Sequence, residues 1–215
     1  MTTSDPLDEL VTGSLDRVTA WPDGQLVSSA PLPSAVLPGS FNPLHAGHRL
    51  LARVTGEMLH APIAFEISVT NVDKPPLAVT EVRARLAQFI GQARVELTRA
   101  PTFLEKSRLF PGATFVVGAD TAERLVATRY YGDETRMIAA LAEIAERGCR
   151  FLVAVRADTA ERVRTLADAA IPARFAHLFT PIPEDLGCPG SMSRHSRRLH
   201  RERAGLQPAT AGSLR

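Results

Sequence analysis

The sequence predicts an α/β protein: a parallel sheet covered by helices on both faces. Short apolar runs alternate with helical patterns along its 215 residues, and this alternation is typical of such sheets. The apolar runs are too short to cross a bilayer. With 45% hydrophobic and 22% charged residues, the composition allows an ordinary globular core.

The elements follow from residue periodicity and from turn residues. Apolar runs predict strands at residues 35–37, 63–69, 94–97, 114–117, 151–155 and 175–179. Helical spacing and capping residues predict helices at about 46–59, 81–91, 121–126, 136–147 and 159–169. Ligands bind at the carboxyl ends of parallel strands, so the functional residues are expected in the polar segments that follow them.

Three regions of the chain are predicted. Residues 1–33, where apolar residues from Leu7 to Val18 recur at helical spacing, are expected to form an N-terminal extension. Residues 34–204 form the main domain, and residues 205–215 are expected to be a disordered tail. No signal peptide is recognisable, so a cytoplasmic protein without a membrane partner is expected.

Charge and cysteine content narrow the function classes. The net charge of +2 gives no reason to expect a nucleic-acid partner. The cluster of arginines from Arg194 to Arg203 favours a local anion site. Cys149 and Cys188 form neither a metal-ligand pattern nor a disulfide framework, so no protein-bound metal is predicted.

The segment from Gly39 to His48, GSFNPLHAGH, follows the first predicted strand and precedes a helix. Gly39 and Ser40 allow a tight turn close to a ligand. Gly47 leaves room for a phosphate at the helix start, where backbone N–H groups are free. The two histidines are three residues apart and can donate hydrogen bonds to one phosphoryl group. The alternative is an ordinary strand–helix turn with two surface histidines, and the combined spacing favours the phosphate site.

This segment resembles the His-x-Gly-His signature of the nucleotidyltransferase superfamily. The continuation of the chain is most similar to the nicotinamide- and nicotinate-mononucleotide adenylyltransferases. The resemblance covers about residues 34–200 and implies a Rossmann-like fold. It implies that His45 and His48 are catalytic and stabilise charge at the attacked α-phosphorus. It also implies nucleotide contacts from Gly39, Ser40, Phe41 and Gly47, with Mg²⁺ held mainly by the ATP phosphates.

Residues after the second strand are expected to bind the acceptor. Asn71 and Lys74 stand where these adenylyltransferases carry a Pro-Val-Asn-Asp-x-Tyr-x-Lys stretch, and Arg83 stands on the helix that follows. A solvated loop charge is the alternative for Lys74, and a surface position is the alternative for Arg83. Lys106, before the 114–117 strand, is expected to be a solvated charge.

The strand that ends in Gly118-Ala-Asp120 resembles the family's Gly-x-Asp segment, which implies that Gly118 and Asp120 hold the nucleotide. Asp120 could also cap the 121–126 helix. Relatives place an aromatic residue near the acceptor ring at the position of Tyr130 or Tyr131, and Tyr131 is favoured here. Arg156, at the end of its strand, is an acceptor-phosphate candidate or a surface charge.

Near the C-terminus the chain departs from the family. The superfamily's Ile-Ser-Ser-Thr-x-x-Arg motif would fall on residues 190–198, where Ser193 and Arg197 keep the serine-to-arginine spacing and Arg194 replaces the threonine. The resemblance implies that Ser193, Arg194 and Arg197 hold the nucleotide phosphates. The motif is either retained in altered form or has a weaker hold on the triphosphate.

These features together predict a nucleotidyltransferase of NAD biosynthesis. It would transfer AMP from ATP to nicotinamide or nicotinate mononucleotide and release pyrophosphate. One alternative is the same chemistry on another phosphorylated acceptor, of the cytidylyltransferase or pantetheine-phosphate type. Another is a nucleotide-binding or slowly ATP-hydrolysing protein without transferase activity. The partners expected are ATP and a phosphorylated small molecule, with a homo-oligomer left open.

Overall fold

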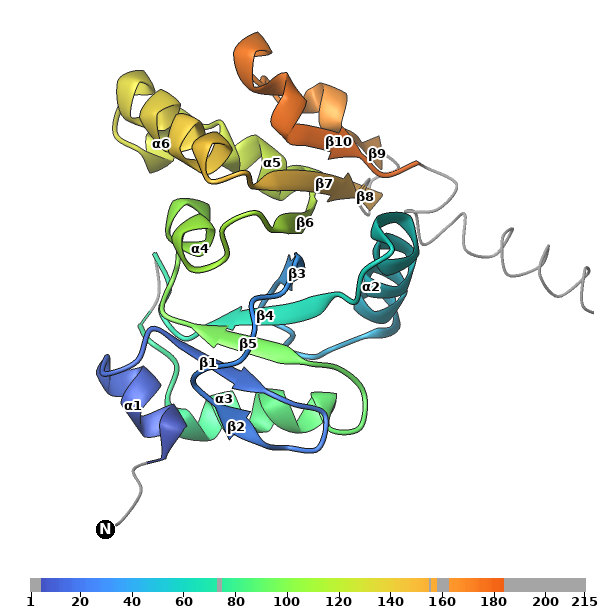
Figure 1. Cartoon of the computed structure of the whole chain (residues 1–215). Helices are drawn as coiled ribbons and strands as arrows, with labels where there is room; N and C mark the ends of the chain where they lie inside the picture. The colour runs from blue at the N-terminus through green and yellow to red at the C-terminus, as the bar shows by residue number, and fades with distance from the viewer. Residues whose placement is uncertain (1–4, 73–74, 155, 158–162, 184–215) are drawn as a thin grey trace, which may run out of the picture.

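The computed structural model describes residues 5–72, 75–154, 156–157 and 163–183 (Figure 1). The strands are β1 (Arg17–Ala20), β2 (Leu26–Val27), β3 (Ala35–Pro38), β4 (Ala64–Ser68), β5 (Val95–Thr98), β6 (Thr114–Gly118), β7 (Arg150–Ala154), β8 (Arg156–Ala157), β9 (Val163–Arg164) and β10 (Phe179–Pro181). The α-helices are α1 (Pro6–Thr12), α2 (Ala46–Leu59), α3 (Val79–Leu86), α4 (Phe103–Leu109), α5 (Ala119–Leu125) and α6 (Glu134–Glu146). The 3₁₀ helices are η1 (Ala87–Phe89), η2 (Thr128–Tyr130), η3 (Leu166–Asp168) and η4 (Ala173–Leu178).

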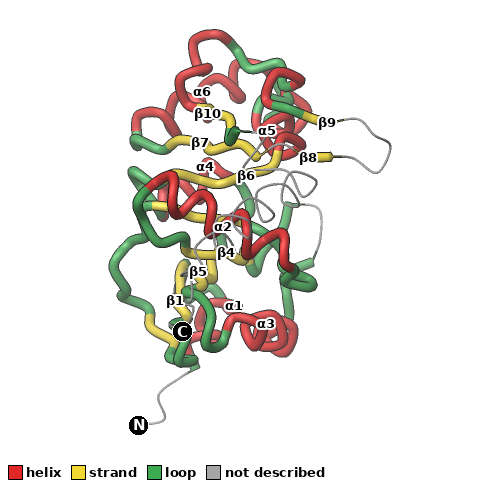
Figure 2. The backbone as a smooth tube through the Cα atoms, turned by 90° about the vertical axis from the view of Figure 1, so that its right-hand side faces the viewer, coloured by secondary structure: helices red, strands yellow, loops and turns green. Residues whose placement is uncertain are grey.

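The main sheet has eight strands in the order β10-β7-β6-β3-β4-β5-β1-β2. The strands from β10 to β5 run parallel, and β1 pairs with β5 antiparallel. Figure 2 shows this succession from β10 at one end to β1 at the other. The chain runs outward from β3 through β4 to β5 and then returns to place β6 on the other side of β3. The strand order therefore reverses between β3 and β6, where doubly wound sheets form their ligand-binding crevice.

Helices cover both faces of the sheet, as the Rossmann-like prediction requires. One core joins α1, α2, α3 and η1 to one side of the strands, through residues such as Leu10, Leu51 and Phe65. The second core joins α4, α5 and α6 to the other side, through residues such as Phe115 and Leu141. Neighbouring residues Val116 and Val117 belong to different cores because successive side chains of a strand point to opposite faces.

The predicted strands before residue 155 and the helices at 46–59, 121–126 and 136–147 are confirmed within a few residues. Two predictions near residue 170 were wrong. Residues 173–178 form η4 and the strand begins at Phe179. The helix expected at 159–169 is replaced, in its described part, by the short strand β9 and by η3. Apolar spacing over so few residues fits a 3₁₀ turn or a strand as well as an α-helix.

The expected N-terminal extension is an integral part of the sheet over its described residues. Helix α1 ends at Gly13, which has a φ of 97°, and the chain then enters β1 rather than continuing as a helix. Leu7 and Leu10 of α1 and Val18 of β1 are fully buried in the first core. The apolar spacing from Leu7 to Val18 therefore belongs to a helix followed by a strand. Residues 205–215 lie outside the described residues.

Helix α4 was not predicted, although its start carried a recognisable signal. Thr102 and Glu105 form a capping box, in which the Thr102 backbone N–H donates to Glu105 and the Glu105 N–H donates to the Thr102 hydroxyl. This helix buries Lys106, which is 5% exposed, so the expectation of a solvated charge there was wrong. The Lys106 Nζ donates to Glu66 Oε1 at 2.7 Å and to the Ala100 carbonyl at 2.7 Å.

Candidate functional site

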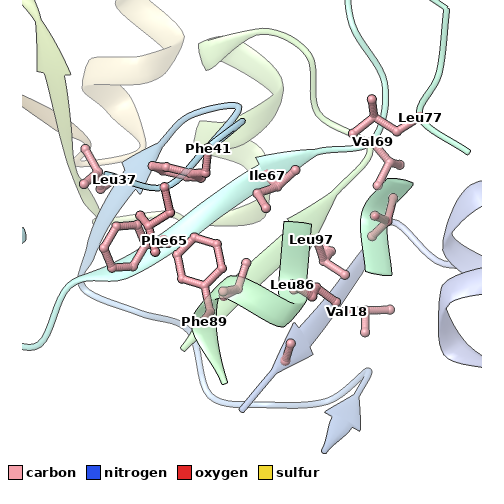
Figure 3. Close-up of a cluster of buried hydrophobic side chains, with 14 of the residues drawn as sticks. Val18, Leu37, Phe41, Phe65, Ile67, Val69, Leu77, Leu86, Phe89 and Leu97 are labelled. Carbon is pink, nitrogen blue, oxygen red and sulfur yellow. The ribbon is translucent and has the colours of Figure 1, made fainter. Parts of the chain in front are cut away.

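The turn from Gly39 to His48 is anchored by the burial of one aromatic ring. Phe41 is 1% exposed and its ring packs edge-to-face on Phe65 and Phe89, as Figure 3 shows. A Cβ on Gly39 would lie 2.7 Å from this ring, so only glycine fits there. The predicted nucleotide contact of Phe41 is therefore ruled out for its side chain, which points into the core. Gly39 and the exposed Ser40 stay at the carboxyl edge of the sheet.

The structure brings the two predicted catalytic histidines together at the start of α2. Their rings stack with centroids 3.6 Å apart, and His48 also contacts the edge of the Phe41 ring at 4.9 Å. His45 is the N-cap residue, and a Cβ on Gly47 would lie 3.1 Å from its ring. The absence of a side chain at Gly47 thus makes room for the His45 imidazole, whereas a phosphate was expected to occupy that space.

Hydrogen bonding and burial define the state of His48. The His45 backbone N–H donates to His48 Nδ1 at 3.3 Å, which leaves the proton of the neutral ring on Nε2. Burial, and then the nearby His45 and Arg49, lower the pKa of His48 to about 4. At neutral pH the His48 ring is therefore uncharged and carries one N–H that can donate to an anion at the helix N-terminus.

Two side chains of the α3 region, which the sequence did not single out, hold this turn. Gln88 accepts a hydrogen bond from the Leu44 N–H at 2.8 Å and donates to the Phe41 carbonyl at 3.0 Å. Arg85 donates to the Ser40 carbonyl at 3.1 Å. Arg85 and Gln88 lie three residues apart, on one face of the helical run. That spacing is a signal in the sequence, but the partners are more than 40 residues away in the chain.

The strands on either side of β3 bring Asn71, Gly118 and Asp120 to the same edge. Asn71 follows β4 and is exposed. On the β6 side, Gly118 is the N-cap of α5 and Asp120 lies in its first turn, so the predicted capping role of Asp120 was wrong. A Cβ on Gly118 would lie 2.8 Å from the Asp120 carboxylate, which folds back over this glycine. His45, Asn71 and Asp120 thus come from neighbouring strand ends.

A cavity of about 320 Å³ opens at this edge, on the face covered by α4 and α5. Its lining comes from the segments that follow β4, β5 and β6, together with η2. The aromatic side chains in the lining are Phe103, Tyr130 and Tyr131. Both tyrosines reach the same cavity because residues 128–130 form a 3₁₀ helix, and an extended chain would have pointed them to opposite sides. The Tyr131 hydroxyl donates to the Leu125 carbonyl at 2.9 Å, and burial raises the Tyr131 pKa.

Arg83 is not brought to this edge. Its guanidinium pairs with Asp5, the N-cap residue of α1, and lines a groove beside Trp21 and Leu26. Its side chain ties α3 to α1, which fits the alternative of a surface position, and the acceptor contact of Arg83 stays a prediction. Lys74, Ser193, Arg194 and Arg197 lie outside the described residues, and for Arg156 the structure describes the backbone in β8.

Comparison with protein-family models and with curated proteins gives no match. Within the residues that the structure describes, no group of three or more His, Cys, Asp or Glu residues is placed to hold a metal ion. No helix in the described ranges is long and apolar enough to span a membrane.

Proposed function

We propose that this protein is a nucleotidyltransferase that moves AMP from ATP to nicotinamide or nicotinate mononucleotide and releases pyrophosphate. The observation that carries the proposal is the stacked pair His45 and His48 at the N-terminus of α2. The pair stands next to the point where the strand order reverses. A helix N-terminus there favours a phosphate group, and the resemblance of residues 39–48 to the His-x-Gly-His signature supports the same assignment.

In the proposed reaction, a phosphate oxygen of the acceptor attacks the α-phosphorus of ATP. A new P–O bond forms there, and the bond to the bridging oxygen of the β-phosphate breaks, so that pyrophosphate leaves with the electron pair. The attacking oxygen is already ionised at neutral pH, so no general base is needed. Mg²⁺ enters with ATP as part of the substrate, held mainly by the phosphates.

The contribution of the protein is to position the reactants and to stabilise the developing charge. His48 Nε2–H is available to donate to an oxygen on the α-phosphorus, because Nδ1 already accepts from the His45 backbone. The stacked His45 ring and the edge of Phe41 fix the orientation of that donor. Since His48 is neutral, it stabilises the transition state by a directed hydrogen bond instead of a full positive charge.

The cavity at this edge of the sheet supports an aromatic acceptor. Its lining comes from the segments that follow β4, β5 and β6, at the same carboxyl edge of the sheet as the His45 turn, and it includes aromatic side chains. The phosphate of a mononucleotide could lie at the sheet edge while its ring enters the cavity. Tyr131 is proposed as part of the acceptor site on this ground, and Asn71 and Asp120 as polar residues at the edge.

The test is to incubate the full chain with Mg–ATP and each mononucleotide, and to measure dinucleotide and pyrophosphate. We expect dinucleotide from at least one mononucleotide. His48→Ala should lower kcat about 100- to 1,000-fold, as for the loss of one transition-state donor. Without dinucleotide from either, the acceptor assignment fails. A panel of other phosphorylated acceptors then tests the related transferases, and phosphate release from ATP alone would indicate hydrolysis.

A further inference from the structure

The cavity on the α4 and α5 face contains a single charged side chain among its described lining residues, that of Arg124. The remainder is aromatic, aliphatic or hydroxylic. Phe103, Tyr130 and Tyr131 supply flat apolar surfaces, and Thr102 and Thr121 supply hydroxyl groups. Such a lining suits a small aromatic ring that carries one polar substituent.

Arg124 is available to pair with a ligand. It is exposed, and no ion pair joins it to another residue in the described parts of the chain. By contrast, Arg108 and Arg147 are both committed to Glu143. The Tyr131 phenol is held by the Leu125 carbonyl and stays neutral, so it adds no negative charge that would repel an anion.

Position along α5 separates Arg124 from the phosphates. The helix begins at Ala119, at the sheet edge where the histidines lie, and Arg124 comes after more than one turn. At 1.5 Å per residue, the six steps from Gly118 to Arg124 correspond to about 9 Å along the axis. A group bound by Arg124 therefore lies well away from the reacting phosphorus, at the end of the acceptor that carries the ring.

We propose that Arg124 selects an acceptor whose aromatic ring bears a carboxylate, so that the preferred substrate is of the nicotinate type. The planar guanidinium can donate two parallel hydrogen bonds to a carboxylate, and a neutral carboxamide offers a single oxygen and no charge. This inference rests on the proposed function for the reaction, but binding of the ring can be measured without it.

The experiment compares wild type, Arg124→Gln and Arg124→Lys with both mononucleotides. We expect wild type to prefer nicotinate mononucleotide. Arg124→Gln should lower kcat/KM for nicotinate mononucleotide by about 10- to 100-fold, the range for one charged hydrogen-bonded contact. The value for nicotinamide mononucleotide should change by less than about threefold, and Arg124→Lys should fall between. Arg136→Gln is the matched control, because it removes the same charge from a side chain that is 74% exposed on α6.

The outcomes separate the two proposals. An equal loss of kcat/KM for both mononucleotides would mean that Arg124 binds a phosphate, and unchanged kcat/KM values for both would mean that it binds neither group. Either result overturns the inference while the transferase stands. If no variant makes dinucleotide, calorimetric titration with each mononucleotide decides. Arg124-dependent binding of nicotinate mononucleotide supports the inference although the proposed function fails, and no binding to wild type overturns both. Circular dichroism verifies that each variant is folded.

Discussion

Breaking the buried pair of Lys106 and Glu66 should be among the most destabilising single changes in this fold. Both side chains are almost fully buried, at 5% and 1% exposed. Glu66 Oε1 accepts from Lys106 at 2.7 Å and from the Thr98 hydroxyl at 2.6 Å. Lys106→Met keeps the aliphatic packing of the side chain but leaves the carboxylate without its cation.

Removal of one partner from a buried pair costs about 3–5 kcal/mol, because an uncompensated charge remains in a poorly solvated place. For a chain of 215 residues, 1 kcal/mol corresponds to a shift in Tm of about 2–4 °C. Lys106→Met should therefore lower Tm by roughly 6–20 °C. The double variant Lys106→Met/Glu66→Leu should recover most of this loss, because it leaves no buried charge unpaired.

The assay is urea denaturation followed by far-UV circular dichroism for wild type, both single variants and the double variant. Arg108→Met is the control, since Arg108 lies on the same helix as Lys106. Its pair with Glu143 of α6 is at the surface and should contribute at most about 1 kcal/mol. A loss below about 1 kcal/mol for Lys106→Met would refute the reasoning. So would a double variant as unstable as the sum of the two single variants.

Three further perturbations test the site and its surroundings. Gln88→Leu leaves the Leu44 N–H without its acceptor. It should lower the free energy of unfolding in urea by about 1–3 kcal/mol and lower kcat, and an unchanged kcat would show that the turn needs no support from η1. Arg83→Gln removes a half-exposed pair with Asp5. It should lower the free energy of unfolding by at most about 1 kcal/mol and leave the acceptor KM unchanged, whereas a raised KM would support an acceptor contact of Arg83. The His48 pKa of about 4 lies below its ordinary value of 6.5, so the unfolded chain binds the extra proton first. The contribution of His48 to the free energy of unfolding is fully present above pH 6.5 and is lost as the pH falls towards 4. His48→Gln should flatten that decline, which is on the order of 1 kcal/mol after allowance for solvent screening of the half-exposed ring. Identical profiles of unfolding free energy against pH for wild type and His48→Gln would contradict the lowered pKa of His48.

Features that depend on neighbours in sequence could be predicted from the chain alone. The proximity of His45 and His48 follows from their three-residue spacing at a helix start, and the structure adds that their rings stack. The helix α6 and its end shortly before Gly148 follow from periodicity and from a glycine with a φ of 72°. In the same way, Thr102 and Glu105 could have revealed α4, because a capping box is local.

Features that depend on distant partners could not be predicted in this way. Phe41 lies next to site residues in sequence, but the rings of Phe65 and Phe89 draw it into the core. Arg83 sits on the expected helix, but Asp5, at the start of α1, determines where its charge goes. No local pattern distinguishes these outcomes, because the energy that decides them comes from contacts across the sheet.

The sequence by itself determined the succession of parallel strands and helices and the His45–His48 turn, because periodicity, capping and glycine placement act over a few residues. Tertiary structure alone decided that residues 17–20 and 26–27 extend the sheet, that Lys106 is buried, and that Arg124 stands in an aromatic cavity. The physical reason is that burial and charge pairing depend on which strands become neighbours. The return of the chain from β5 to β6 fixes those neighbours and brings distant strand ends to one edge.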